Sequence, residues 1–200
     1  MKIEIIQEQL LAGLNIVSRA VASRAQLPVL SHILIEAKDE GLVLSATDLE
    51  IGMRTIVPAK VIEPGRVTVP AKMFGEFLSS LNPGKVEIKS EGESISIVAP
   101  GYRGKFQVID AGEFPTIPEL SKNDPLCRVS PAELGLSVSR VVFACAKDSL
   151  RPVLTGVLWE FGKKKVRLVA TDGFRLAVEE LSVETSMEQL NLLVPARVVM

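Results

Sequence analysis

The chain contains two similar halves that are offset by 124 to 125 residues. Across 27–50 and 151–174, nine of 24 ungapped positions are identical. Three short matches occur in the same order in both halves: Pro28-Val29-Leu30 with Pro152-Val153-Leu154, Ala46-Thr47-Asp48 with Ala170-Thr171-Asp172, and Val69-Pro70-Ala71-Lys72 with Val194-Pro195-Ala196-Arg197. Ordered matches of this kind predict one folding unit present twice, which constrains the fold more than any single element does.

Each half begins with an apolar stripe at helical spacing. The stripe residues lie four, three and four positions apart in both halves: Leu10, Leu14, Val17 and Val21 in the first, and Leu134, Val138, Val141 and Cys145 in the second. Such spacing places them on one face of a helix. The second helix is preceded by Ser130-Pro131, with Glu133 three residues after the serine, which predicts a capping box.

Strand patterns follow each helix. Hairpins are expected over 33–37 with 42–45 and over 157–161 with 166–169, because apolar runs flank polar turns there. The first half continues with a strand at 67–69, a helix from Pro70 to about Leu81, and strands at 86–89, 94–98 and 105–109. This order predicts an α+β fold with helices on one face and mainly antiparallel sheets on the other.

The repeat also sets the expected domain boundaries. We expect a first domain over 1–122 and a second over 128–200, with the proline-bearing stretch 114–125 as the linker. The second copy stops one turn into the helix that matches 70–81, so it is expected to be a truncated repeat.

Composition excludes several protein classes. There are 23 Lys+Arg against 24 Asp+Glu, a net charge of −1, so any contact with a polyanion needs positive charge gathered on one surface. No apolar run reaches the roughly 18 residues of a membrane helix, and the acidic start is unlike a signal peptide. Cys127 and Cys145 show no disulfide framework, which favours a cytoplasmic location. With a single histidine, His32, a histidine-rich metal site is impossible in one chain.

Catalytic motifs are largely absent, so no cofactor and no metal are expected. Gly84-Lys85 lacks the rest of a phosphate-binding P-loop, His32 has no acidic partner in sequence, and Cys145 lies on an apolar stripe. Thr47-Asp48 and Thr171-Asp172 are carboxylate candidates for a metal-dependent phosphotransfer enzyme. Because both end a strand at the same place in the repeat, hydrogen bonding within a turn is the favoured interpretation.

The helix surfaces opposite the apolar stripes are small or polar in both halves: Glu8, Ala12, Asn15, Arg19 and Ala22, and Glu133, Ser137, Arg140, Ala144 and Lys147. A solvated helix face explains them, and so does a smooth surface that contacts phosphates loosely. The hairpin tip Lys163-Lys164-Lys165 has the same two interpretations, a solvated turn being favoured over a phosphate contact.

Five short runs of sequence together resemble a known protein family. They are Leu27-Pro28-Val29-Leu30, Ala46-Thr47-Asp48-Leu49-Glu50, Val69-Pro70-Ala71-Lys72, Glu113-Phe114-Pro115, and Ala170-Thr171-Asp172-Gly173-Phe174-Arg175-Leu176. Together they resemble the bacterial DNA polymerase III beta subunit, the family of replicative sliding clamps. The resemblance implies tandem clamp domains and a non-catalytic processivity factor that encircles duplex DNA as a ring of two copies.

The resemblance also implies site residues and partners. DNA contact is expected at Arg24, Arg19, Lys72, Arg140 and Lys147. A groove for partner peptides is expected at Arg151, Leu154, Thr171, Gly173, Phe174, Arg175 and Leu176. A strand around Phe106 and Val108 is expected to pair with a second copy, head to tail. The implied partners are double-stranded DNA, the DNA polymerase III catalytic subunit, the clamp loader, and other polymerases and repair proteins.

Two other functions remain open at this point. A metal-dependent enzyme requires Asp48 and Asp172 to converge on one metal. A protein-interaction scaffold requires only the groove, so that replacing Arg24 and Lys72 leaves its function intact.

Overall fold

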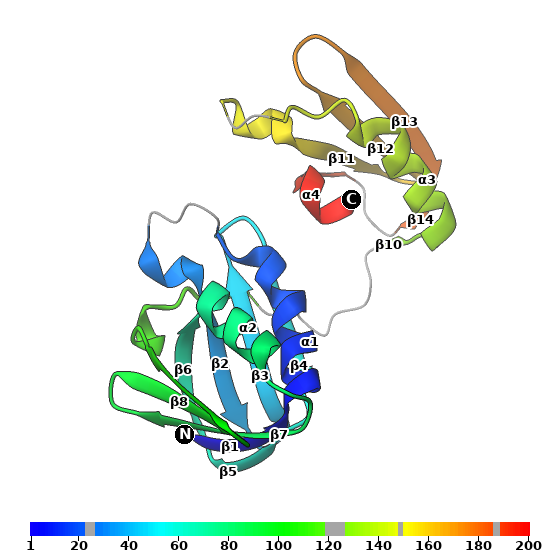
Figure 1. Ribbon diagram of the computed structural model, residues 1–200. Coiled ribbons are helices and arrows are strands. Elements are labelled where there is room, and N and C mark those ends of the chain that lie inside the picture. The colour runs from blue at the N-terminus through cyan, green and yellow to red at the C-terminus, as the bar shows by residue number, and fades with distance from the viewer. Residues whose placement is uncertain (23–26, 119–126, 148–149, 186–188) are drawn as a thin grey trace. The chain divides into compact units, whose positions relative to one another are not determined.

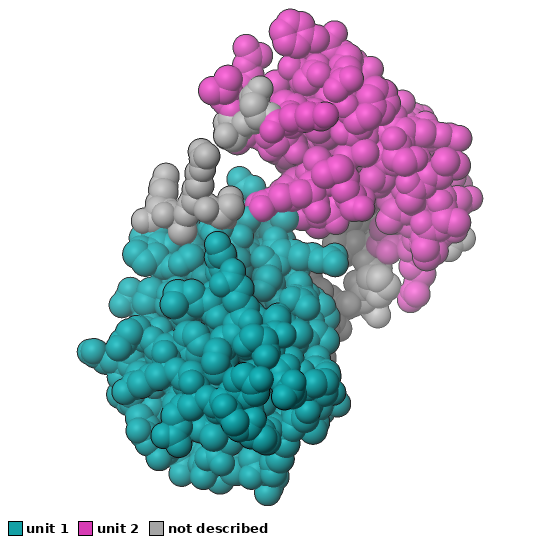
Figure 2. Space-filling view, viewed as in Figure 1, with its two compact units in different colours: residues 1–119 teal, residues 120–200 magenta. Residues whose placement is uncertain are grey.

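The computed structural model describes residues 1–22, 27–118, 127–147, 150–185 and 189–200 (Figure 1). The chain divides into two compact units, unit 1 over Met1–Glu119 and unit 2 over Leu120–Met200 (Figure 2). Each unit has its own cluster of buried apolar side chains.

Unit 1 has two antiparallel sheets covered by two helices. The helices are α1 (Gln7–Val17) and α2 (Ala71–Ser80), which contact each other on one side of the sheets (Figure 1). One sheet has the order β5 (Lys60–Glu63), β1 (Lys2–Ile6), β7 (Lys85–Glu91), β8 (Ser94–Ala99) and β9 (Tyr102–Gln107). The other has the order β4 (Gly52–Val57), β3 (Gly41–Thr47), β2 (His32–Lys38) and β6 (Gly65–Pro70). Short 3-10 turns lie at Ser18–Ala20, Pro28–Ser31 and Ala111–Glu113.

The core of unit 1 lies between the helices and both sheets. Alternate residues of β2, Ile33, Ile35 and Ala37, are buried, and so are Leu10 and Leu14 of α1. The period of two on the strand and the period of about four on the helix therefore meet at one apolar layer.

Unit 2 repeats the four-stranded half of this plan. Its sheet has the order β13 (Leu176–Ser182), β12 (Lys165–Thr171), β11 (Gly156–Gly162) and β15 (Leu190–Pro195), which matches the order β4-β3-β2-β6 of unit 1. Helix α3 (Pro131–Val142) packs on β12 and β13, and a short α4 (Ala196–Val199) follows β15. Strands β10 (Cys127–Arg128) and β14 (Glu184–Thr185) form a two-stranded sheet, and η4 (Pro152–Thr155) is a 3-10 turn. The tandem α+β repeat is confirmed.

The helices differ from the expected ones at their ends. Helix α1 ends at Val17 and α3 at Val142, so Val21 and Cys145 follow the helices and pack from the turns beyond them. The capping box is wrong: the Ser130 side chain makes no cap hydrogen bond, although its carbonyl accepts the Leu134 N–H at 2.9 Å as the first hydrogen bond of the helix. None of the helices in the described part of the chain has the length and hydropathy needed to cross a bilayer.

Strand prediction failed where the strands are short or exposed. Strands β1, β4, β5 and β13 were not expected, because half or more of their residues are polar or exposed. The strand expected at 105–109 is β9, which begins earlier because Tyr102 already pairs with Ala99 across a tight turn.

The segment expected as a linker belongs in part to unit 1. Phe114 is buried against Val29 and Leu30, so the chain stays packed on the sheet through this region. Residues 119–126, the rest of the expected linker, lie outside the described residues.

Candidate functional site

A tight turn between β12 and β13 organises the main candidate site. The Thr171 hydroxyl accepts the Gly173 N–H at 3.0 Å and donates to the Arg175 carbonyl at 2.7 Å. The Asp172 carboxylate accepts the N–H groups of Phe174 and Arg175, both at 3.0 Å. Gly173 has φ +91°, the left-handed region that glycine adopts without cost.

Unit 1 contains the same turn at Thr47 to Ile51. The Thr47 hydroxyl accepts the Leu49 N–H and donates to the Ile51 carbonyl, and the Asp48 carboxylate accepts the N–H groups of Glu50 and Ile51. The interpretation of both Thr-Asp pairs as turn-forming residues is therefore confirmed. Because these carboxylate oxygens already accept backbone N–H groups, they are poorly placed as metal ligands.

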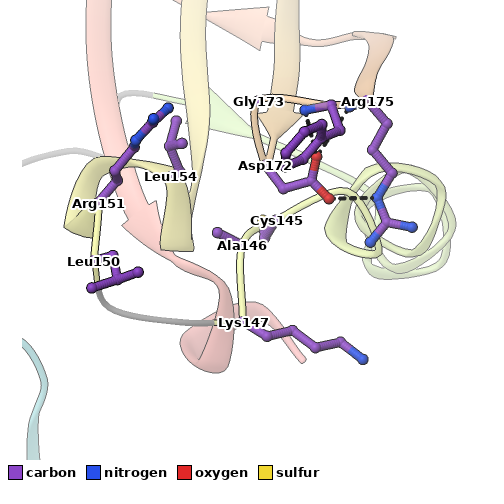
Figure 3. Close-up of a pocket in the computed structure, with 10 residues that line it drawn as sticks. Cys145, Ala146, Lys147, Leu150, Arg151, Leu154, Asp172, Gly173 and Arg175 are labelled. Carbon is purple, nitrogen blue, oxygen red and sulfur yellow. Dashed lines mark hydrogen bonds and ion pairs between the residues drawn. The ribbon is translucent and has the colours of Figure 1, made fainter.

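The turn in unit 2 forms one wall of a pocket of about 660 Å³ (Figure 3). Residues 145–147 and the 3-10 turn η4 supply the other walls. The lining residues are Cys145, Ala146, Lys147, Leu150, Arg151, Leu154, Asp172, Gly173, Phe174 and Arg175. Backbone bonds hold the walls together: the Ala146 N–H donates to the Leu154 carbonyl, and the Leu154 N–H donates to the Arg151 carbonyl, both at 2.9 Å.

The pocket combines exposed apolar groups with cations. Leu150 is 88% exposed and Phe174 is fully exposed, which is unusual for large apolar side chains. Arg151 and Lys147 are exposed on its rim. A short extended peptide with apolar side chains and an acidic flank fits this chemistry.

Electrostatics tie the turn to the neighbouring helix. The Arg175 Nε is 2.9 Å from the Asp172 Oδ2, and the Arg175 guanidinium lies 5.5 Å from the centre of the Phe143 ring. Hydrogen bonds from the backbone N–H groups of Phe174 and then Arg175 lower the pKa of Asp172. Burial raises the pKa of the Cys145 thiol, whose Sγ lies 3.5 Å from the Gly156 carbonyl, so this cysteine is neutral packing at the pocket floor.

Five of the seven residues expected in the groove line this pocket: Arg151, Leu154, Gly173, Phe174 and Arg175. Thr171 does not line it, because its hydroxyl closes the turn from behind, and Leu176 begins β13 outside it. Sequence reasoning missed the other five lining residues, Cys145, Ala146, Lys147, Leu150 and Asp172. Leu150 was the most visible of them, because it directly precedes Arg151 in a loop that has little reason to carry a leucine.

The described residues among those expected to contact DNA lie in helices or in the segments that follow helices. Arg19 lies in the turn after α1, Lys72 lies in α2, and both are exposed. Lys147 is exposed after α3, whereas Arg140 is paired with Glu179 at 2.7 Å, which reduces its attraction for phosphate. Arg24 lies outside the described residues.

Two residues expected on the exposed helix face are buried instead. Ser137 is 5% exposed, because α3 packs on both β12 and β13 and turns more of its surface inward than its apolar stripe indicates. Ala144 follows the end of α3 and is fully buried in the core of unit 2.

The strand expected to pair with a second copy is an edge strand among the described residues. Strand β9 pairs with β8 and ends its sheet. The two named side chains, Phe106 of β9 and Val108 just after it, pack against the core of unit 1, however. The Phe106 ring makes edge contacts with Phe74 and Phe77 at 5.4 and 5.5 Å, and Val108 packs on the core. A partner strand would therefore meet the backbone of β9 rather than these side chains.

His32 has a structural position. It is buried at the start of β2, with its Nδ1 3.2 Å from the Thr68 Oγ1. The Thr68 hydroxyl donates its one proton to the Ile109 carbonyl, so His32 must be the donor in the contact with Thr68. Across the described residues, no three His, Cys, Asp or Glu side chains gather as a metal site would require.

Family models match both units in succession. Residues 1–118 match "DNA polymerase III beta subunit, N-terminal domain", and residues 128–200 match the central domain of the same subunit. A relative from Synechocystis named beta sliding clamp is 35% identical over 189 residues, covering 90% of this chain and 48% of the relative.

Solved structures agree. The DNA polymerase sliding clamp from Bacillus subtilis superposes with a TM-score of 0.89 at 25% identity, covering all of this chain and 55% of that one. The DNA polymerase III subunit beta from Pseudomonas aeruginosa gives 0.84 at 31% identity, again covering all of this chain and 55% of its own. The chain thus spans about half the length of the relatives it matches.

Proposed function

The chain belongs to the DNA polymerase III beta subunit family, and we propose that it is part of a sliding clamp that encircles duplex DNA and tethers a polymerase to its template. The observation that carries this proposal is the succession of two matched family domains on two units with the same turn and the same strand order. Such a protein has no catalytic activity of its own. It stays on DNA because it encircles the duplex, rather than because it binds tightly.

DNA contact in this proposal comes from the helix side. Arg19 and Lys72 in unit 1 and Lys147 in unit 2 are exposed cations, and Arg24 is proposed with them on the resemblance alone. Contacts of this type bind phosphates without reading bases, as sliding requires. Arg140 contributes less, because Glu179 holds its guanidinium.

The pocket of unit 2 is the proposed docking site for partner peptides. Phe174 and Leu154 offer apolar contact, and Arg151 and Lys147 favour acidic flanking residues. We propose that the polymerase, the clamp loader and repair proteins bind at this pocket.

The backbone edge of β9 is proposed to pair with a second copy of the protein, head to tail. We also propose that the protein works in the cytoplasm.

A topological experiment tests the central claim. The chain is joined to the part of a relative's sequence that it does not cover, and the resulting clamps are loaded onto nicked circular plasmid. Their retention on DNA is measured by gel filtration before and after the plasmid is linearised. Retention on circles and loss from linear DNA is expected. Equal retention on both contradicts the proposal. The 200-residue chain alone is expected to show no such difference, because it covers only about half of its relatives.

A second experiment tests the pocket. Phe174→Ala is expected to weaken binding of a peptide with two apolar anchors and an acidic flank by about tenfold or more, a loss typical of an exposed aromatic anchor. Because Phe174 is fully exposed, the variant should keep the wild-type unfolding midpoint. Val153→Ala, which removes an exposed apolar side chain outside the pocket, is the matched control and should bind normally.

A further inference from the structure

Each unit also has a pocket of its own at the start of the first helix of its repeat. In unit 1 six of its lining residues are Glu4, Ile5, Ile6, Gln9, Pro58 and Ala59. Moved by 124 positions, these become Arg128, Val129, Ser130, Glu133, Ser182 and Val183, and all six line a pocket of about 670 Å³ in unit 2. The same cavity is therefore built twice from equivalent backbone positions.

Three equivalent positions in or beside the two pockets carry opposite charges, although Lys60 and Lys85 also line the pocket of unit 1. Arg128 stands where unit 1 has Glu4. The hairpin tip of unit 2 that reaches the pocket is Lys163-Lys164, where unit 1 has Asp39-Glu40. Both tips are two-residue turns between paired strands, so the hairpin geometry does not demand lysine. Since the fold accepts acids at these positions, the lysines call for another explanation.

The cations of unit 2 are also less well compensated. In unit 1, Glu4 is paired with Lys60 at 3.3 Å and with Lys85 at 2.8 Å. In unit 2, neither Lys163 nor Lys164 forms an ion pair within the part of the chain that the structure describes, although the adjacent Lys165 is paired with Glu180 at 2.9 Å.

One carboxylate among the lining residues opposes this positive charge, that of Glu133. The two hairpin lysines therefore carry most of the charge that remains for a ligand.

We infer that Lys163, Lys164 and Arg128 form a phosphate-contact site for the backbone of nucleic acid, separate from the helix face. The inference rests on the proposed function, which brings nucleic acid to this protein. The ammonium groups of Lys163 and Lys164 lie at a hairpin tip, and the exposed serines Ser130 and Ser182 line the same pocket. Together they supply hydrogen-bond donors for phosphate oxygens. An acidic protein segment is less favoured, because a protein interface needs apolar anchors and the apolar side chains here, Val129 and Val183, are half-buried or buried.

The test uses the 200-residue chain and a short fluorescein-labelled DNA duplex. Binding is measured by anisotropy over a salt series for wild type, for the double variant Lys163→Gln with Lys164→Gln, and for Lys165→Gln. The last is the matched control, because it changes a lysine of the same hairpin that is already paired with Glu180. The double variant should lower the slope of log affinity against log salt by about two and weaken low-salt binding by about tenfold. The control should match wild type.

Three outcomes overturn the inference or its premise separately. If the double variant and Lys165→Gln have the same slope as wild type, while Arg19→Gln with Lys72→Gln weakens binding, the hairpin site is wrong and the proposed DNA contact stands. If wild type binds no duplex even at low salt, the proposed DNA contact itself fails. If a labelled oligoglutamate peptide needs the two lysines and the duplex does not, the pocket takes an acidic protein segment instead.

Discussion

Leu49 and Gly173 occupy the same position of the same turn in the two repeats, and both have positive φ, +77° and +91°. In each turn the residue donates its N–H to the preceding threonine hydroxyl. Glycine adopts this conformation freely, whereas a leucine in it is strained by about 1–2 kcal/mol. The hydrogen bonds of Thr47 and Asp48 therefore hold unit 1 in a conformation that its own residue disfavours.

Leu49→Gly is expected to stabilise unit 1. The leucine is 63% exposed, so its removal exposes little new apolar surface, while the backbone strain is relieved. After allowing for the extra freedom of glycine in the unfolded chain, a gain of about 0.5–1 kcal/mol is expected. Urea unfolding followed by a probe in unit 1 measures it, and a lower unfolding midpoint would contradict the account.

The reciprocal change, Gly173→Ala, is expected to destabilise unit 2 by about 1 kcal/mol. A Cβ at this position would lie 3.6 Å from the Arg151 Nη1, an ordinary contact, so the cost comes from the backbone rather than from a clash. Gly162→Ala is the control, since this glycine lies in β11 without a positive φ and a Cβ there meets nothing closer than 3.7 Å. Equal losses for both variants would show that the left-handed conformation of Gly173 does not matter.

Two helix glycines should respond in opposite directions to alanine. A Cβ on Gly13 of α1 would lie 2.5 Å from the Val57 Cγ2 and 2.9 Å from the Leu44 Cδ1, so Gly13→Ala should cost about 1–3 kcal/mol. A Cβ on Gly135 of α3 meets nothing within 4 Å, and Gly135→Ala should stabilise by about 0.5–1 kcal/mol. Thermal unfolding of both variants checks this, and a change of the same sign in both would refute it.

The stability of unit 1 is expected to fall on mild acidification because of His32. Burial lowers the pKa of His32 below its usual value of 6.5, so the folded state favours the neutral ring. The unfolded chain then binds more protons than the folded chain at acidic pH. Stability is therefore complete above about pH 6.5 and declines as pH falls below it.

This can be measured from the urea midpoint between about pH 7.5 and 5. Since His32 is the only histidine of the chain, His32→Gln, which can still donate to the Thr68 hydroxyl, should remove most of the decline. If the stability of His32→Gln falls by the same amount over this pH range, titration of groups other than His32 causes the decline.

The repeat and its helices were predictable because they depend on periodic apolar residues. Leu10 and Leu14 are spaced as a buried helix face must be, and Ile33, Ile35 and Ala37 are the alternate buried residues of β2. The partner strand β3 is buried along its whole length, as its apolar run indicates. Strand β4 was missed because Met53 and Thr55 face inward while Arg54 and Ile56 are exposed, a pattern that mixes polarity on both faces.

The pocket was only partly predictable, for a different reason. The sequence marked Asp172 as a turn residue, and the turn it forms is also the wall that places Phe174 and Arg175 at the pocket. Asp172 thus both holds the turn and lines the pocket. The burial of Ser137 and Phe114 depends on which elements pack over them, and local sequence carries no signal for that.

The Asp172 carboxylate should make the turn of unit 2 sensitive to strong acid. Hydrogen bonds from the Phe174 and Arg175 N–H groups lower its pKa in the folded chain, so its contribution to stability is complete above the unfolded value of about 3.9 and is lost as pH falls through the lower folded value. Asp172→Asn keeps an oxygen acceptor for these N–H groups but cannot titrate. Wild type should therefore lose more of the stability of unit 2 than Asp172→Asn does as pH falls from about 5 to 2. Glu133→Gln removes an exposed carboxylate away from the turn and should follow wild type. If Asp172→Asn also follows wild type, the charged form of Asp172 does not stabilise the turn.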